Sequence, residues 1–430
     1  MKHSITKHPG FSLASIDQGN SNQTAVAYIS VDVHKERTAK SHSIELLYTD
    51  ALISGAGKYN RAAFLDAINQ LGATVSASIS DSILTIFVRS KADVFPKVLT
   101  LIDTMLTSPH FDKDELKRIK LTVTNALKES KEESRAIAHE ELRNTIYGVH
   151  DRRYSHTEDT LIEALKSVTS KDLATLHTHV QSLTWTCSIA SGTHEIEQFT
   201  KTITKLNKGT RKVIGEFGVH QQKPPQPTVV LRDIPSRQNI DFSIGAPIPI
   251  TLHHPDYIPL MFGITVLAKW GGFAGRLMST VREIDGLTYM IYARTETFLN
   301  EEQGYWRIAT FFSPNQALAG LASTFHQIKK IHDHGITEEE LIRFKHILHT
   351  ASVLKNDSTS SLLHELHAYH LQRFTLEEIA EHKKRVHSLT REEVNTAIKH
   401  YLDPKTLTIS GAGPIANVKK ELQAFMKTAT

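Results

Sequence analysis

The chain has 430 residues, of which 40% are hydrophobic and 22% are charged, and its formal net charge is +4. This composition is typical of a soluble globular protein with room for two domains, and it argues against a disordered chain. The nearly balanced charge gives no support for a nucleic-acid partner, which would require clustered cations.

Cysteine usage and apolar runs narrow the class further. Cys187 is the only cysteine, so an internal disulfide and a cysteine-based zinc site are both excluded. Its alternating apolar surroundings favour a small core residue over a nucleophile. Residues 1–20 lack the apolar core of a signal peptide, and no run approaches the roughly 18 apolar residues of a membrane-spanning helix. We therefore expect a cytoplasmic protein with no membrane partner.

The first half of the chain alternates between strand-like and helix-like periods. In chain order we predict a strand at 22–33, helices at 43–56 and 59–71, a hairpin of strands 74–80 and 82–88 around Asp81, helices at 92–106 and 112–147, the latter kinked, a helix at 168–180, and a strand at 187–192. Residues 209–227 are rich in glycine, glutamine and proline without a hydrophobic period, which predicts an extended linker.

The second half repeats this order. We predict strands at 228–231 and 240–245, helices at 257–270 and 274–284, strands at 289–297 and 304–312, helices at 315–334, 338–355 and 389–402, and a strand at 407–413. Meandering strands with grouped long helices indicate an α+β sandwich rather than a doubly wound sheet. The direction of the strands is not fixed by these patterns.

The two halves also share sequence. A Glu-Leu-x-Arg-x-Lys motif begins at Glu115 and again at Glu340, 225 residues later, and the helices and strands that close each half correspond as well. Three matched pairs in the same order indicate an internal duplication. We therefore predict two similar αβ sandwich domains, at 1–208 and 228–430, joined by the linker at 209–227.

The segment from Asp256 to Tyr289 carries the most specific motifs. After Asp-Tyr and a long helix it reads Gly-Gly-x-x-x-Arg-Leu at 271–277 and Val-Arg-Glu-x-x-Gly-Leu-x-Tyr at 281–289. With these motifs at this spacing, the chain resembles the insulinase/pitrilysin-like zinc metallopeptidase family over nearly its whole length. The resemblance is to its two-domain members, the processing-peptidase-like subunits.

The resemblance also identifies a zinc site that this chain has lost. Active members carry His-x-x-Glu-His on the first long helix and a distal glutamate, which bind zinc and activate a water molecule. The corresponding residues here are Leu46, Thr49, Asp50 and Ala126, and a supporting glutamate is replaced by Ile119. We therefore expect this chain to bind no metal and the zinc to belong to a partner subunit.

The sequence offers two other candidate metal sites. For each of them a role without a metal is the favoured interpretation. Asp50 could hold a cation together with Glu45 or Glu129, although an acidic residue on a helix surface explains it more simply. His364 and His367 could share a helix face. They do not follow the order of the zinc motif, so a solvated or hydrogen-bonded helix face is favoured.

In active assemblies of the family that this chain resembles, an arginine and a tyrosine reach the zinc site from the C-terminal half. Their counterparts here are Arg282 and Tyr289, seven residues apart across an Asp285-Gly286 turn. A guanidinium and a phenol both donate hydrogen bonds, which suits a substrate carbonyl or an oxyanion. In the alternative interpretation both are scaffold: Arg282 pairs with Glu283 or Asp285, and Tyr289 packs in the sheet.

The strand at 74–80 corresponds to the edge along which a peptide substrate adds in this family. Active members favour an Asn-Ala-x-Thr type of segment, whereas this chain has Ser76-Ala77-Ser78-Ile79, which weakens the expectation of close substrate binding.

Together these features predict a non-catalytic subunit of a heterodimeric metallopeptidase. The homologous partner would bring the zinc, and this chain would bring Arg282 and Tyr289 to the peptide substrate. The alternative is a scaffold or peptide-binding protein of the same fold with no part in proteolysis. An independent enzyme with a metal site at His364 and His367 is the least favoured possibility.

Overall fold

The computed structural model describes residues 1–19, 23–33, 37–207, 227–269, 274–299, 302–355 and 358–429. The expected linker at 209–227 lies outside the described residues except for Pro227, and so do residues 271–273 of the glycine motif. The chain divides into two compact units. Unit 1 comprises Met1–Lys128, His156–Gly218 and Val353–Ile379, and unit 2 comprises Glu129–Ser155, Val219–Ser352 and Ala380–Thr430.

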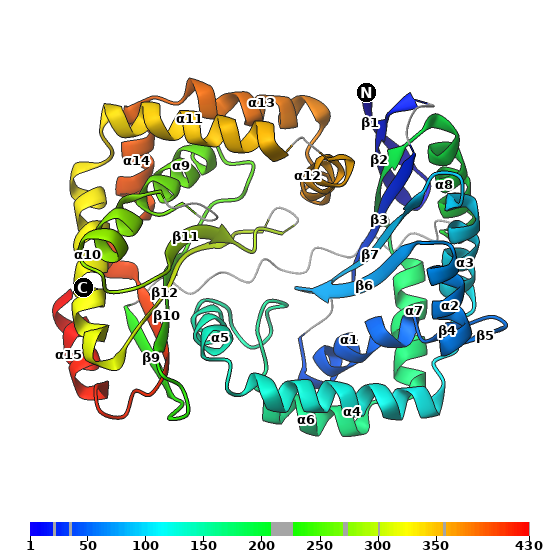
Figure 1. Cartoon of the computed structure of the whole chain (residues 1–430), viewed down its shortest axis with the longest axis horizontal. Helices are drawn as coiled ribbons and strands as arrows, with labels where there is room; N and C mark the ends of the chain where they lie inside the picture. The colour runs from blue at the N-terminus through cyan, green and yellow to red at the C-terminus, as the bar shows by residue number, and fades with distance from the viewer. Residues whose placement is uncertain are drawn as a thin grey trace. The chain divides into compact units, whose positions relative to one another are not determined.

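A six-stranded sheet in the order β1-β2-β8-β3-β7-β6 forms the centre of unit 1 (Figure 1). Its strands are β1 Lys2–His8, β2 Phe11–Asp17, β3 Thr24–Asp32, β6 Thr74–Ser80, β7 Ile83–Lys91 and β8 Trp185–Ser191. Only β2 and β8 run parallel; the other neighbours are antiparallel. The predicted hairpin around Asp81 is confirmed. Asp81 and Ser82 have positive φ angles of 48° and 61°, as a two-residue turn between antiparallel strands requires.

The sheet of unit 2 has five strands in the order β11-β12-β10-β13-β9. They are β9 Thr228–Asp233, β10 Ile240–Pro247, β11 Ile291–Glu296, β12 Tyr305–Phe312 and β13 Thr408–Gly413. Only β9 and β13 run parallel. Taken from β9, this order repeats β2-β8-β3-β7-β6 of unit 1, so the duplicated α+β architecture is confirmed.

Helices cover each sheet and enclose one large hydrophobic core per unit. Those of unit 1 are α1 Ala39–Leu52, α2 Arg61–Gln70, α3 Phe95–Thr107, α4 Lys113–Ser130, α6 Glu158–Ser167, α7 Ser170–Ser182 and α8 Thr193–Leu206. A two-strand ribbon, β4 Gly55–Ala56 and β5 Tyr59–Asn60, links α1 and α2. α3 shows why these helices pack, because it buries Phe95, Val98 and Ile102 on one face. Each such side chain stabilises the fold by about 1.5–3 kcal/mol.

Unit 2 has the corresponding helices and one unusual element. They are α9 Tyr257–Leu267, the π-helix η2 Met278–Ile284, η3 Pro314–Gln316, α10 Ala317–His334, α11 Glu338–Lys355, α13 Leu376–Ser388, α14 Arg391–Tyr401, η4 Pro404–Thr406 and α15 Lys419–Ala429. The predicted helix at 338–355 is confirmed residue for residue, whereas the predicted helix at 274–284 is largely a π-helix.

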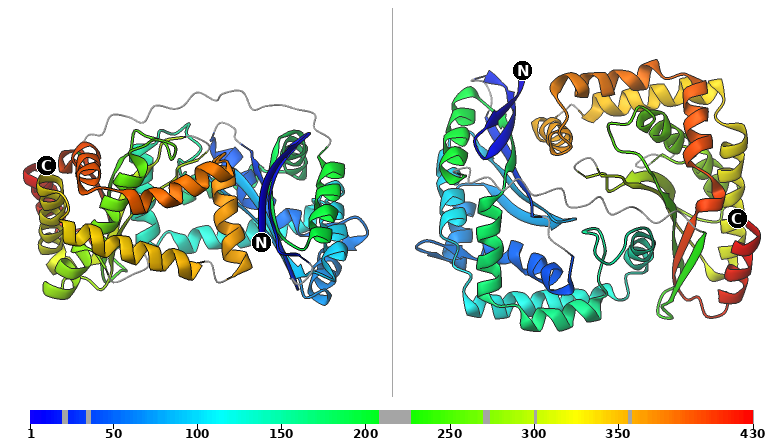
Figure 2. Two further views of the ribbon diagram at one scale, coloured as in Figure 1. Left: turned by 90° about the horizontal axis from the view of Figure 1, so that it is seen from above. Right: turned by 180° about the vertical axis from the view of Figure 1, so that it is seen from behind.

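The two halves of the chain exchange one helix each (Figures 1 and 2). α5, Ser134–Ile146, comes from the first half and packs on β10, β13 and β9 of unit 2. α12, Thr359–Leu371, comes from the second half and packs on β8, β3 and β2 of unit 1. Both helices begin and end 225 residues apart, which is the spacing of the repeated motif. The domain boundaries at 1–208 and 228–430 stay a prediction about which segments are duplicated. The two compact units differ from them, because each unit contains a segment from the other half of the chain.

The exchange explains one wrong prediction. The helix expected at 112–147 is two helices, because α4 ends at Ser130 and α5 begins at Ser134. At that point the Ser134 hydroxyl donates to Asp241 Oδ2 at 2.5 Å, and Ile137 and Leu142 are buried in unit 2. The apolar faces of the two helices thus belong to different cores.

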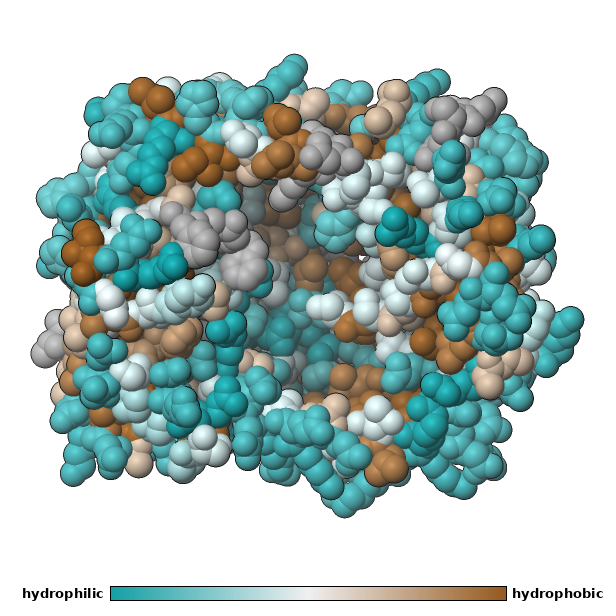
Figure 3. Space-filling view, viewed as in Figure 1, coloured by the Kyte–Doolittle hydropathy of each residue, from teal (hydrophilic) through white to brown (hydrophobic). Residues whose placement is uncertain are grey.

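β1 and β2 were not predicted from the sequence. β1 is an edge strand of mostly polar residues, Lys-His-Ser-Ile-Thr-Lys-His, so it lacks the apolar alternation of a half-buried strand. On the face shown in Figure 3, hydrophilic residues cover much of the surface. Within the described parts of the chain, no helix combines the length and apolar character needed to cross a membrane.

Candidate functional site

Arg282 and Tyr289 lie together in unit 2. Arg282 is on η2, and Tyr289 is in the segment between η2 and β11. The Arg282 guanidinium carbon lies 5.0 Å from the centroid of the Tyr289 ring, which is a cation–π contact. Tyr289 is 71% exposed, so it does not pack in the sheet as the scaffold alternative requires. The prediction that Arg282 and Tyr289 lie close together across one turn is therefore confirmed.

The turn between these residues is fixed from several sides. The Asp285 N–H donates to the Thr280 carbonyl at 2.9 Å, and the Leu287 N–H donates to the Val281 carbonyl at 3.0 Å. Gly286 has a φ of +65°, which glycine adopts readily. From α10, the Ser323 hydroxyl donates to the Asp285 carboxylate at 2.6 Å. π-Helical turns are rare and frequently occur at functional sites, so this local geometry favours a functional pair.

An exposed apolar side chain lies beside the pair. Ile284, the last residue of η2, is 78% exposed. A large apolar group and an aromatic ring exposed near a guanidinium have the composition of a contact surface. Ile284 could not be predicted as a site residue from the sequence, because a helical period alone does not distinguish an exposed isoleucine from a buried one.

The positions of the lost zinc site lie in unit 1. Leu46 and Thr49 on α1 are half-buried, while Asp50 on α1 and Ala126 on α4 are exposed. Leu46 and Asp50 are one helical turn apart, as the histidines of the motif would be. Leucine and alanine have no donor atom, and a catalytic zinc site uses three protein ligands. These residues do not fit zinc.

The remaining carboxylate near this position is already bound. Glu45 is buried on α1, where its Oε2 lies 2.8 Å from Arg37 Nη1 and its Oε1 accepts from the Ser82 hydroxyl at 3.1 Å. The proposed cation site of Asp50 with Glu45 is therefore wrong. Among the residues that the structure describes, no three histidine, cysteine, aspartate or glutamate side chains gather as metal ligands would.

The histidines of α12 are structural. His367 is 4% exposed, and its ring nitrogens lie 2.8 Å from the Ser30 hydroxyl and 2.9 Å from the Ser188 hydroxyl. Its ring also stacks on Tyr28 at 4.7 Å between centroids. A metal site at His364 and His367 is wrong, because both nitrogens of His367 bind serine hydroxyls. The cluster instead attaches α12 to the sheet of unit 1.

Acid is expected to weaken this attachment. Burial lowers the pKa of His367 to about 3 and that of His370 to about 4, so both are neutral in the fold at pH 7. Unfolded histidine titrates at about 6.5. Below that pH the unfolded chain takes up protons that the folded unit cannot. Stability is therefore lost between about pH 6.5 and 4 for His370, and between about pH 6.5 and 3 for His367. At pH 5 each ring should cost about 2 kcal/mol.

Urea unfolding followed by circular dichroism at pH 7 and pH 5 measures this loss. His370→Leu should reduce the difference between the two midpoints. His346→Gln, which changes an exposed ring on α11, should leave it unchanged. If the His370 variant and the natural chain lost the same stability between pH 7 and pH 5, buried His370 would not be a cause of the loss.

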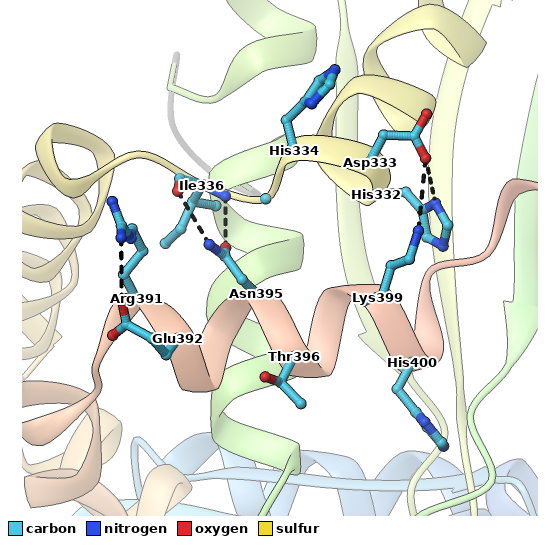
Figure 4. A pocket seen from close by; sticks show the side chains of 11 residues that line it. His332, Asp333, His334, Ile336, Arg391, Glu392, Asn395, Thr396, Lys399 and His400 are labelled. Carbon is cyan, nitrogen blue, oxygen red and sulfur yellow. Dashed lines mark hydrogen bonds and ion pairs between the residues drawn. The ribbon is translucent and has the colours of Figure 1, made fainter.

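A separate open pocket of about 840 Å³ lies between the end of α10 and α14 (Figure 4). The charged groups that line it pair with one another. Asp333 lies 3.0 Å from His332 and 3.9 Å from Lys399, and Arg391 lies 3.2 Å from Glu392. Because these charges are matched within the pocket, its lining does not indicate a particular ligand.

Comparison with known proteins agrees with this arrangement. Residues 46–159 match the model of the insulinase family, peptidase family M16, and residues 167–348 match the model of the peptidase M16 inactive domain. A non-peptidase homolog from Helicobacter pylori, YmxG, is 21% identical over 382 residues, which span 87% of this chain and 84% of that protein.

Solved structures show the same fold. A peptidase M16 inactive domain from Pseudomonas fluorescens superposes with a TM-score of 0.84 at 19% identity, over 96% of this chain and 98% of that one. A protease from Helicobacter pylori superposes with a TM-score of 0.79 at 15% identity, over 96% and 99% of the two chains. The chain therefore belongs to the insulinase family, peptidase family M16, as a member without the zinc-binding motif.

Proposed function

We propose that this chain is the zinc-less subunit of a two-subunit metallopeptidase. It would bring Arg282 and Tyr289 to a peptide held at the zinc site of a homologous partner. The observation that carries the proposal is a contrast within one chain. At the zinc-ligand positions Leu46 and Ala126 have no donor atom, while the half-buried Arg282 and the exposed Tyr289 are held together on a fixed turn. A pair of donors held in this geometry is better suited to binding a ligand than to packing in the core.

The chemistry of the pair suits an oxyanion. When water attacks a peptide carbonyl, its oxygen becomes negative, and donors that already point at that oxygen lower the barrier. The guanidinium of Arg282 carries a permanent charge, and the phenol of Tyr289 adds a neutral O–H donor. The contact through the ring face orients the guanidinium in advance.

A peptide could also contact β6. This strand lies at the edge of the unit 1 sheet, and the side chains of Thr74, Ser76, Ser78 and Ser80 are exposed along it. Such an edge can accept an extended peptide through main-chain hydrogen bonds, and small hydroxyl side chains would select little among peptide sequences.

Reconstitution tests the proposal. We expect the isolated chain to cleave no internally quenched peptide, and a zinc-bearing partner alone to cleave it poorly. Mixing the two should yield a complex on size exclusion and an activity that chelation removes. A partner that is fully active alone, or that forms no complex with this chain, would contradict the proposal.

A non-proteolytic scaffold is the second candidate. It is favoured by the relative from Helicobacter pylori, which is described as a non-peptidase homolog, together with the lost zinc positions. A stable complex with the partner that has no more activity than the partner alone would select this candidate.

A further inference from the structure

The exchange of α5 and α12 joins the two halves of the chain at two places. α4 ends at Ser130 and α5 begins at Ser134, yet α5 packs on the sheet of unit 2. In the same way α11 ends at Lys355 and α12 begins at Thr359, yet α12 packs on the sheet of unit 1. Each half of the chain therefore gives one helix to the other half and receives one from it.

α5 packs on its sheet mainly through apolar side chains. Leu142 has no exposed surface and belongs to a cluster with Tyr305 of β12. Nearer the start of the helix, Ile137 belongs to a cluster with Ala412 of β13. Removal of such apolar surface from water is the main driving force of most protein association. The face of the unit 2 sheet therefore binds α5 as a protein interface would.

α12 packs on its sheet with a larger share of hydrogen bonds. The ring nitrogens of His367 lie 2.8 Å from the Ser30 hydroxyl of β3 and 2.9 Å from the Ser188 hydroxyl of β8. At the start of the helix the Gln18 amide donates to the Thr359 hydroxyl at 2.8 Å. Buried polar groups are costly to leave without their partners, so the unit 1 sheet requires a polar side chain at the place of His367.

The two helices are not interchangeable. Because α5 and α12 begin and end 225 residues apart, His367 of α12 occupies the place that Leu142 has in α5. A leucine at that place in unit 1 would take the imidazole away from Ser30 and Ser188. An imidazole in the place of Leu142 would be buried in the apolar cluster of Tyr305. Each sheet therefore selects the helix of the other half.

We propose that the two halves of the chain, 1–207 and 227–430, bind one another through α5 and α12 and remain a 1:1 pair without a covalent link. The interaction surface is the face of each sheet that the exchanged helix covers. The partner that it fits is the complementary half of the same chain. Because both helices must leave before the halves separate, the two contacts act together as a bivalent link. The inference does not depend on the proposed peptidase function.

Cutting the folded full chain tests the inference. A protease recognition sequence is inserted between residues 207 and 227, an affinity tag is attached at Met1, and the purified chain is cut at pH 7. We expect one particle of unchanged size on size exclusion. The tagged first half should also retain the second half through repeated washing on the affinity resin.

Variants locate the contact. Leu142→Ala should raise the rate at which the second half leaves the captured first half by about 10²-fold, because truncation of a buried leucine weakens the contact of α5 with its sheet. Leu363→Ala, which truncates a fully buried side chain of α12, should act in the same direction. The matched control is Leu121→Ala on α4, a leucine that is 64% exposed, and it should leave the rate unchanged. Circular dichroism of each uncut variant checks that it folds.

The inference is overturned if the halves of the natural chain separate on size exclusion after the cut, or if each half pairs with a copy of itself. It is also overturned if Leu142→Ala and Leu363→Ala release the second half no faster than Leu121→Ala does. These measurements involve neither zinc nor peptide cleavage. Failure of this inference and failure of the proposed function can therefore be told apart.

Discussion

In the reconstituted peptidase, Arg282→Ala is expected to lower kcat/KM by about 10²–10³, because one preorganised oxyanion donor commonly contributes that much. The loss should fall mainly on kcat, since the guanidinium meets its full negative charge only when the carbonyl oxygen becomes an oxyanion. Tyr289→Phe should cost less, about tenfold, because a neutral hydroxyl forms a weaker hydrogen bond than a charged donor. Peptide cleavage by complexes of equal zinc content measures both effects.

Two controls separate catalysis from folding. Arg237→Ala truncates an exposed arginine elsewhere in unit 2 and should leave the rate unchanged. Arg282→Lys keeps the charge but loses the planar fork, and it should restore only part of the rate. If Arg282→Ala assembled with the partner and cleaved peptides at the natural rate, the pair would have to be regarded as scaffold.

The repeated architecture was accessible from sequence because local patterns repeat. The Glu-Leu-x-Arg-x-Lys motif and the closing strands fixed the duplication, and the structure repeats the strand order. The exchange of α5 and α12 was not accessible. The apolar face of α5 indicates that the helix is buried, but no local pattern says against which sheet. That choice depends on contacts such as Ser134 with Asp241, 107 residues apart in the chain.

The same distinction holds for the sites. The seven-residue spacing of Arg282 and Tyr289 was enough to predict that a turn brings them together. The contact of His139 with Tyr305 could not be predicted, because it joins β12 to a helix from the other half of the chain. His367 was ambiguous for the same reason, since its serine partners lie on strands far from it in sequence.

The second large expected effect is a loss of stability when the buried ion pair of Arg37 and Glu45 is broken. Both side chains are almost fully buried, and they lie 2.8 Å apart at the start of the helix that in active relatives would carry zinc. Arg37→Ala should lower the free energy of unfolding by about 3–5 kcal/mol, because it leaves the Glu45 carboxylate buried without its counter-charge. Urea unfolding followed by circular dichroism at pH 7 measures the loss.

The double variant Arg37→Met with Glu45→Gln separates the charge from the packing. It removes both charges and keeps an acceptor for the Ser82 hydroxyl, so it should recover most of the stability that Arg37→Ala loses. If the double variant were as unstable as the single one, the pair would act through packing instead. Recovery would mean that Arg37→Ala loses stability through the buried Glu45 charge left without Arg37, and that α1 does not require the ion pair itself.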